Sequence, residues 1–208
     1  MNRSEKFWDK QASGFADQEQ HTRLEENKDF ITTLKYLDKA DSVLDYGCAT
    51  GIVSNAIADK VKEIHAIDIS PKMIEMAKTI ASERNIENIH YAPGTIFQES
   101  LKKEQFNVIL AFRILHMLED IRTVIRRINE LLKPGGIFIS VFACLGEKKG
   151  LMGMLVLLAS KLKIVPVKVN LFKLPELQEL MTSEGFEIVE YEKMDDRLPH
   201  YCIVARKV

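Results

Sequence analysis

The chain has 208 residues, a length that fits one domain with at most a modest insertion. Its 29 Lys and Arg residues nearly balance its 30 Asp and Glu residues, whereas proteins that coat nucleic acid are normally strongly basic, so no nucleic-acid partner is expected. Hydrophobic residues make up 46% of the chain, a value typical of globular proteins and too high for a disordered one.

The three cysteines stand far apart and provide neither a disulfide framework nor a paired zinc-binding motif. We therefore expect a reduced, cytoplasmic protein without a metal site. The first ten residues carry charges with no apolar run behind them, so no signal peptide is expected. Because no uncharged stretch approaches the roughly 20 residues that a membrane-spanning helix needs, no transmembrane segment is expected either.

From residue 42 onward, strand-length apolar runs alternate with segments of helical period, which is typical of a parallel sheet covered by helices. An N-terminal segment, 1–38, precedes them and is expected to form a helical lid, with a leading helix over 21–37. The expected strands and helices that follow are, in chain order, strand 42–46, helix 51–58, strand 63–68, helix 70–84, strand 89–92, strand 106–112, helix 121–132, strand 137–142, helix 174–183 and a closing strand pair, 186–191 and 201–206. The pattern predicts an α/β fold, a doubly wound, mostly parallel seven-stranded sheet with helices on both faces, built as a single domain over 1–208.

One segment, 146–174, does not fit the alternation. It contains six lysines and one acidic residue, and its centre is apolar on more than one helical face. We expect an insertion after the fifth strand that forms a cap over an acceptor pocket. A dimer interface and a peripheral contact with an anionic membrane surface remain alternatives, so the chain is expected to be a monomer or a homodimer.

A glycine-rich segment, Val43-Leu-Asp-Tyr-Gly-Cys-Ala-Thr-Gly51, follows the first expected strand. Such a turn lets the backbone approach a ligand closely and directs free helix N–H groups at a negative group. Asp68 ends the second expected strand, where a carboxylate can accept hydrogen bonds from both hydroxyls of a ribose. The turn, the acid and the alternation together predict a nucleoside cofactor at the carboxyl edge of the sheet.

With these motifs the chain resembles the class I S-adenosylmethionine-dependent methyltransferases, and in particular their small-molecule branch. The family's first motif, apolar-apolar-Asp-x-Gly-x-Gly-x-Gly, is similar to residues 43–51. The resemblance continues through 65–77, through Leu115-His-Met-Leu-Glu-Asp120 and through Leu131-Leu-Lys-Pro-Gly-Gly-Ile137, and it includes the opening segment 7–15. It implies a Rossmann-like fold and S-adenosylmethionine as the cofactor.

The resemblance also implies roles for individual residues. Asp45 would bind the ammonium group of the cofactor, or it stabilises the turn; Asp68 would hold the ribose, or it caps a helix. Met73 would pack on the adenine, or it only packs its own helix. The positions that the resemblance assigns to the cofactor are Asp45, Gly47, Cys48, Ala49, Gly51, Asp68, Ile69, Met73, Thr95, Ile96, Ala111 and Phe112.

Two positions depart from the family pattern. Ala49 stands at the middle glycine of the first motif and adds a methyl group where the backbone approaches the cofactor. After the third strand the family often has Gly-Asp, but here Gly94 is followed by Thr95, so adenine recognition is expected from Thr95, Ile96 or the backbone.

Candidate acceptor-side residues follow the fourth strand and lie near the N-terminus. Arg113 would pair with an anionic substrate or form a surface ion pair, and His116 would act as a base or satisfy backbone groups. Trp8 and Phe15 would form a lid or pack a leading helix. Cys144 and Cys202 are expected to be buried packing residues.

The expected activity is the transfer of a methyl group by in-line displacement to a small-molecule acceptor with an apolar body and an anionic group. Because the methyl group of a sulfonium is already activated, the reaction chiefly needs positioning and desolvation. Two alternatives stay open: an NAD(P)-dependent Rossmann enzyme, although the Gly-x-Gly-x-x-Gly spacing is not met, and a non-catalytic nucleoside-binding protein.

Overall fold

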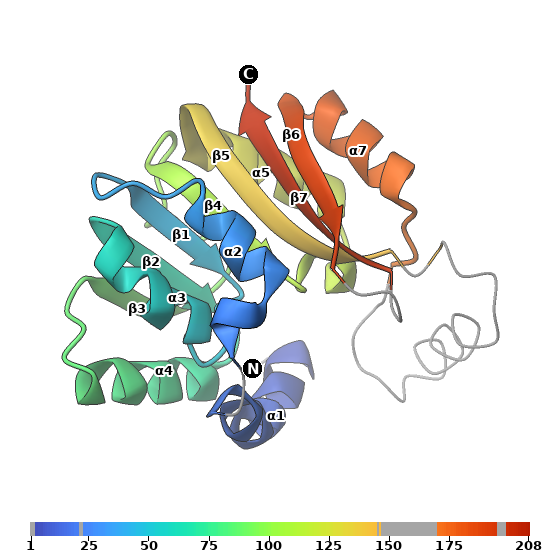
Figure 1. Cartoon of the computed structure of the whole chain (residues 1–208). Helices are drawn as coiled ribbons and strands as arrows, with labels where there is room; N and C mark the ends of the chain where they lie inside the picture. Colours follow the sequence, from blue (N-terminus) through green and yellow to red (C-terminus); the bar gives the residue numbers. More distant parts are fainter. Residues whose placement is uncertain (1–2, 21–22, 145, 147–169, 195–198) are drawn as a thin grey trace.

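The computed structural model describes residues 3–20, 23–144, 146, 170–194 and 199–208, with the backbone alone considered for 16–20 (Figure 1). Its core is a seven-stranded sheet of order β3-β2-β1-β4-β5-β7-β6. The strands are β1 Ser42–Tyr46, β2 Glu63–Asp68, β3 Ile89–Pro93, β4 Phe106–Phe112, β5 Leu132–Ala143, β6 Phe186–Lys193 and β7 His200–Lys207.

The sheet is mostly parallel, as the sequence predicts. β3, β2, β1, β4 and β5 pair in parallel, and β7 pairs antiparallel with both β5 and β6. The direction in which successive strands are added changes between β1 and β4. In sheets of this kind, ligands bind outside the carboxyl ends of the strands at this point. The predicted doubly wound α/β fold is confirmed.

Helices cover both faces of the sheet (Figure 1). On one face, α2 Lys28–Leu34, α3 Ile52–Ile57 and α4 Pro71–Glu83 contribute to a core cluster that includes Val43. On the other, α5 Ile121–Leu131 and α7 Leu174–Ser183 contribute to a second cluster that includes Leu44. Consecutive residues of β1 thus point to opposite buried faces, which explains why all five residues of the strand are buried instead of alternating between buried and exposed.

The N-terminal segment differs from its prediction. A single helix over 21–37 is wrong: the chain forms α1 Arg3–Gln20, a short 3₁₀ turn Leu24–Glu26, and then α2. Asn27 interrupts the pattern because it adopts an extended conformation before α2. α1 is mostly polar, but its apolar residues Phe7, Trp8, Ala12 and Phe15 recur at helical spacing. This short apolar stripe precedes the region in which strands and helices alternate, and no separate helix is predicted there from the sequence.

β5 is longer than predicted. The residues Lys133-Pro-Gly-Gly136 do end α5, but they already belong to the strand, which starts at Leu132. Gly135 has a φ of +72°, and the pairing with β4 shifts register between Phe106 and Val108. A bulge at this glycine therefore joins helix and strand without a separate loop.

The predicted insertion, 146–174, falls mostly outside the described residues. Of the helices within the part of the chain that the structure describes, none combines the length and the apolar character needed to cross a bilayer. Cys48, Cys144 and Cys202 are buried, in agreement with the packing role predicted for the latter two.

Candidate active site

The loop between β1 and α3 has an unusual backbone. Gly47, Ala49 and Gly51 have φ angles of +79°, +48° and +82°. Backbone N–H groups of Gly47 and Cys48 donate to the carbonyl of Ile67 at 2.8 and 3.1 Å, which fixes the loop to the end of β2. The first-motif segment is thus held in a compact turn at the carboxyl edge of the sheet.

The two glycines of this loop are required for space as well as for conformation. A Cβ atom on Gly47 would lie 2.6 Å from Cδ1 of Ile114, and one on Gly51 would meet the hydroxyl of Tyr91. That hydroxyl donates to Oδ1 of Asn55 at 3.1 Å in a buried position. A side chain at either glycine would therefore have to displace Ile114 or Tyr91, and it would adopt a strained positive φ.

Ala49 is the exception, because an L-residue with a side chain occupies a left-handed conformation there. Ala49→Gly is expected to raise the free energy of unfolding by about 0.5–1 kcal/mol. The left-handed conformation costs an L-residue about 1–2 kcal/mol and costs glycine very little. Part of this gain is lost, because glycine loses more chain entropy on folding than alanine does. Urea unfolding measures the change. Ala56→Gly in the regular helix α3 is a matched control that should destabilise by about 1 kcal/mol. Equal destabilisation by both substitutions would contradict the assignment.

Asp45 lies at the end of β1 and is 3% exposed. Its Oδ2 accepts a hydrogen bond from Ser54 Oγ at 2.6 Å. Burial raises the pKa of Asp45 to about 6, Ser54 opposes this shift, and the nearby charge of Asp68 adds to it. A buried carboxylate with an elevated pKa favours a cationic partner, and the ammonium group of an amino acid would be one.

Asp68 joins the loop to the start of α4. Its Oδ2 accepts from the N–H of Ala49 at 3.1 Å, and its Oδ1 accepts from the N–H of Ser70 at 2.9 Å. Burial raises the pKa of Asp68, whereas these backbone hydrogen bonds lower it. Since each carboxylate oxygen can accept more than one hydrogen bond, Asp68 retains acceptor capacity for two ribose hydroxyls.

α1 lies beside the N-terminal end of α4 (Figure 1). Asp9 accepts from Ser70 Oγ at 2.5 Å and from the N–H of Lys72 at 3.2 Å. Trp8 and Phe15 are partly buried and their rings meet edge to face at 5.9 Å. α1 is therefore anchored next to Asp68. Sequence reasoning missed Asp9, whose partners are more than 60 residues away.

The other residues predicted to bind the cofactor differ in how exposed their side chains are. Met73 is 2% exposed, and its N–H donates to the N-cap Ser70 at 3.1 Å. Ile96 is fully buried in the core cluster, and its carbonyl accepts from Arg127, whereas Thr95 is exposed. Ile69 and Phe112 are partly buried, and Ala111 is fully buried. Of the predicted adenine-side pair, only Thr95 presents an accessible side chain.

Arg113 follows β4 with a φ of +58°. Its Nη2 lies 2.6 Å from Oδ2 of Asp29 in α2. The Asp29 side chain is 6% exposed and that of Arg113 is 51% exposed, so the ion pair is buried on one side only. Arg113 forms an ion pair, one of the two alternatives that the sequence offers for it; its partner could not be identified from the sequence, because the two residues lie 84 positions apart.

His116 lies in a 3₁₀ turn, Leu115–Met117, just beyond Arg113. Burial lowers the pKa of His116 to about 4, and the proximity of His200 and Arg113 adds to the shift. The imidazole is therefore neutral at pH 7. Within the described part of the chain, its buried Nδ1 has no hydrogen-bond partner. A neutral imidazole with an unsatisfied nitrogen at this edge can exchange a hydrogen bond with a ligand.

The C-terminal part of the 146–174 segment lies beside this turn. Asn170 donates from its backbone N–H to the carbonyl of His116 at 2.8 Å and from Nδ2 to the carbonyl of Leu118 at 2.6 Å. The N–H of Gly146 donates to the carbonyl of Phe172 at 3.1 Å. Asn170 thus lies next to His116, and Gly146 lies next to Phe172, two residues further along the chain.

This geometry fits S-adenosylmethionine. A compact glycine-rich turn, a buried acid for an ammonium group and a second acid for a ribose lie at one edge of the sheet. The model of a methyltransferase domain family matches residues 37–199 of the chain. The chain belongs to the class I S-adenosylmethionine-dependent methyltransferases. Of the three predicted function classes, the methyltransferase prediction is confirmed at the level of the family.

Individual methyltransferases are similar over part of their length. The chain is 29% identical over 99 residues to YcgJ, an uncharacterised methyltransferase of Bacillus subtilis (strain 168), which covers 48% of the chain and 39% of YcgJ. It is 31% identical over 108 residues to a ubiquinone biosynthesis O-methyltransferase of Coxiella burnetii (strain Dugway 5J108-111), with coverages of 50% and 46%. The matched stretches therefore span less than half the length of these relatives.

A Haloferax volcanii protein solved in complex with the Trm112 methyltransferase activator superposes with a TM-score of 0.76. The superposition covers 96% of the chain and 97% of that protein at 15% identity. At this identity, the similarity shows a shared fold.

Proposed function

We propose that this protein transfers the methyl group of S-adenosylmethionine to a small-molecule acceptor by in-line displacement. The observation that carries the proposal is the arrangement around Asp68, which ties the strained glycine loop to the start of α4 and keeps acceptor capacity for a ribose. Bound S-adenosylmethionine supplies an activated methyl group on a sulfonium. The chain's own residues then have to bind, orient and exclude water.

Asp45 and Asp68 hold the two ends of the donor in this proposal. The buried Asp45 pairs with the ammonium group, and its desolvated carboxylate gains more from that pair than an exposed one would. Asp68 accepts from the ribose hydroxyls. Ala49 narrows the space beside the loop, so the tail of the donor contacts a methyl group where most of the family has a glycine.

The acceptor approaches from the side of His116. Its neutral imidazole accepts a hydrogen bond from a hydroxyl or amine of the acceptor and orients that atom toward the methyl group. The name of the Coxiella burnetii relative, a ubiquinone biosynthesis O-methyltransferase, supports a small-molecule acceptor of this kind. The target atom would then be a hydroxyl oxygen.

The 146–174 segment forms a cap over the acceptor in this proposal, which the contacts of Asn170 with His116 and Leu118 support. Its six lysines and apolar centre favour an acceptor with an apolar body and an anionic group. Arg113 contributes little to the recognition of an anion, because Asp29 already neutralises it. The single-domain organisation over 1–208, with 1–38 as a lid, belongs to the same proposal.

The test is a transfer assay with S-adenosylmethionine labelled in its methyl group and a panel of phenols, amines and carboxylic acids with apolar bodies. Label is expected in an apolar acceptor that carries an anionic group, and loss of residues 148–168 should lower turnover of that acceptor. Tight binding of the donor without transfer to any member of a broad panel would instead support a non-catalytic binding protein.

His116→Gln is expected to lower kcat about 100-fold, the lower end of the range for a residue that handles a proton or orients a reacting group. The KM for S-adenosylmethionine should stay within about twofold, because His116 lies on the acceptor side. At saturating donor, the wild-type rate should be constant from pH 8 to about 5 and fall toward pH 4, as protonation removes the acceptor nitrogen. A rate profile with its midpoint near 6.5, or an unchanged kcat in the variant, would contradict this role.

A further inference from the structure

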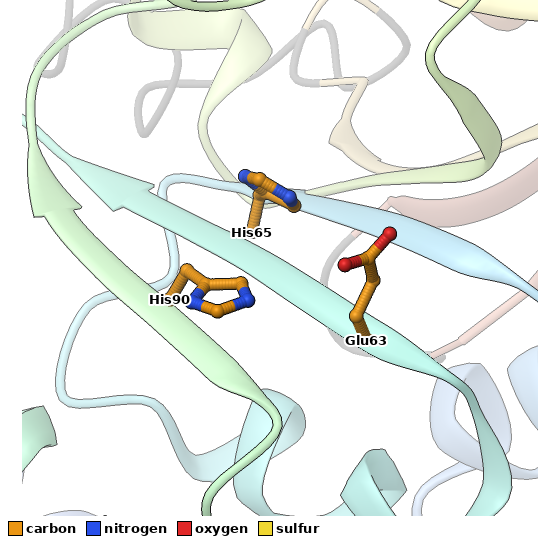
Figure 2. Close-up of side chains that lie close together, drawn as sticks. All are labelled: Glu63, His65 and His90. Atoms are coloured by element: carbon orange, nitrogen blue, oxygen red, sulfur yellow. The ribbon is translucent and has the colours of Figure 1, made fainter.

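Three side chains with metal-binding atoms meet on β2 and β3, away from the candidate active site. Glu63 and His65 project from the same face of β2, since alternate residues of a strand share a face. His90 is the register partner of His65 on β3. One potential ligand atom of each of the three residues lies within 4.8 Å of those of the other two. Figure 2 shows the three side chains arising from these two neighbouring strands.

The cluster is only partly buried. Residues 94–105, which connect β3 to β4, form no helix. Glu63 and His65 are partly buried and His90 is exposed. On the inner side, the ring of the fully buried Phe106 packs edge to face against His65, with centroids 5.4 Å apart.

We propose that Glu63, His65 and His90 form a binding site for a divalent transition-metal ion such as Zn²⁺. Two imidazoles and one carboxylate are ligands that Zn²⁺ accepts, and three protein ligands leave one position of a tetrahedral ion to water. The ligands come from two strands, so a bound ion crosslinks the edge strand β3 to β2.

This site is separate from the site for the methyl donor. Glu63 begins β2 and Asp68 ends it, and the three residues from His65 to Asp68 span roughly 10 Å along a strand. Metal binding and donor binding should therefore be independent of each other. The cluster is hard to predict from the sequence, because the two histidines lie 25 positions apart and only the pairing of β2 with β3 brings them together.

Isothermal titration of the untagged full chain with ZnCl₂ at pH 7.5, in a buffer that does not bind zinc, tests the proposal. One ion per chain is expected, together with a higher thermal-unfolding midpoint that EDTA reverses. Each of His65→Gln and His90→Gln should weaken zinc binding at least 10-fold, and Glu63→Gln less. The affinity for S-adenosylmethionine should stay within about twofold in all three variants.

His200→Gln is the matched control, since it removes one histidine elsewhere in the fold and should leave zinc affinity unchanged. Circular dichroism confirms that each variant is folded. Absence of zinc binding at millimolar concentration, or equal affinity in the wild type and the His65→Gln/His90→Gln double variant, would overturn the proposal. A Co²⁺-substituted sample gives a second readout, because visible absorption bands report direct coordination and should disappear in the double variant.

Discussion

Asp68→Ala is expected to lower the affinity for S-adenosylmethionine at least 100-fold. The carboxylate accepts from the N–H groups of Ala49 and Ser70 and has capacity left for two ribose hydroxyls. Hydrogen bonds to a charged group contribute roughly 1.5–3 kcal/mol each, so two lost ribose bonds account for about 3 kcal/mol or more, which corresponds to 100-fold or more in Kd. Titration calorimetry of the donor measures the change.

Two further variants separate binding from loop structure. Asp68→Asn keeps an acceptor oxygen but loses the charge, so it should bind the donor more tightly than Asp68→Ala and less tightly than the wild type. Asp59→Ala removes an exposed aspartate in the 3₁₀ turn Ala58–Lys60, at the opposite end of β2, and should leave affinity unchanged. Unaltered donor affinity in a folded Asp68→Ala protein would refute the placement of the ribose.

Asp45→Asn is expected to stabilise the ligand-free protein and to weaken donor binding. Burial raises the pKa of Asp45 from 3.8 to about 6, so its charged form is less favourable in the folded than in the unfolded chain. The shift of about two units corresponds to roughly 2–3 kcal/mol of lost stability at neutral pH. Asparagine keeps an acceptor for Ser54 and avoids this cost.

The stability difference between the wild type and Asp45→Asn should increase with pH. The folded chain binds more protons at Asp45 than the unfolded chain between pH 3.8 and about 6. The wild type therefore loses stability, relative to Asp45→Asn, as pH rises through this window. The difference in free energy of unfolding should be small at pH 4, grow to roughly 2–3 kcal/mol by about pH 7 and stay nearly constant above. Urea unfolding of both proteins from pH 4 to 8 measures it.

Donor affinity should change in the opposite direction. The neutral amide of the Asp45→Asn variant offers no charge to the ammonium group, so the variant should bind S-adenosylmethionine about 10-fold more weakly at pH 7.5, and wild-type affinity should fall toward that of the variant below pH 6. Ser54→Ala, which removes only the hydrogen-bond donor to Asp45, should raise the pKa of Asp45 further. A difference in stability that does not vary with pH would contradict a buried, titrating Asp45.

The local sequence determined most of the secondary structure and the main cofactor-binding motifs of this protein. The alternation of apolar runs with helical periods predicts every strand of the sheet and the helices after residue 50, because buried strands and amphipathic helices have distinct periods that a chain displays locally. The glycine turn and Asp68 are also local signals, since a positive φ and a strand-end acid follow from a few adjacent residues. The family and its cofactor therefore follow from short motifs in the right order.

Tertiary structure decided what depends on contacts between distant residues. Asp29 reaches Arg113 across 84 residues, and Asp9 reaches Ser70 across 61, so neither the paired state of Arg113 nor the docking of α1 beside the cofactor site has a local signature. The same holds for His116, whose low pKa results from burial and from His200, which β7 places nearby. His65 and His90 become a cluster only through strand pairing. A sequence specifies which elements form because periodicity is local, whereas which side chains meet depends on how the sheet orders its strands.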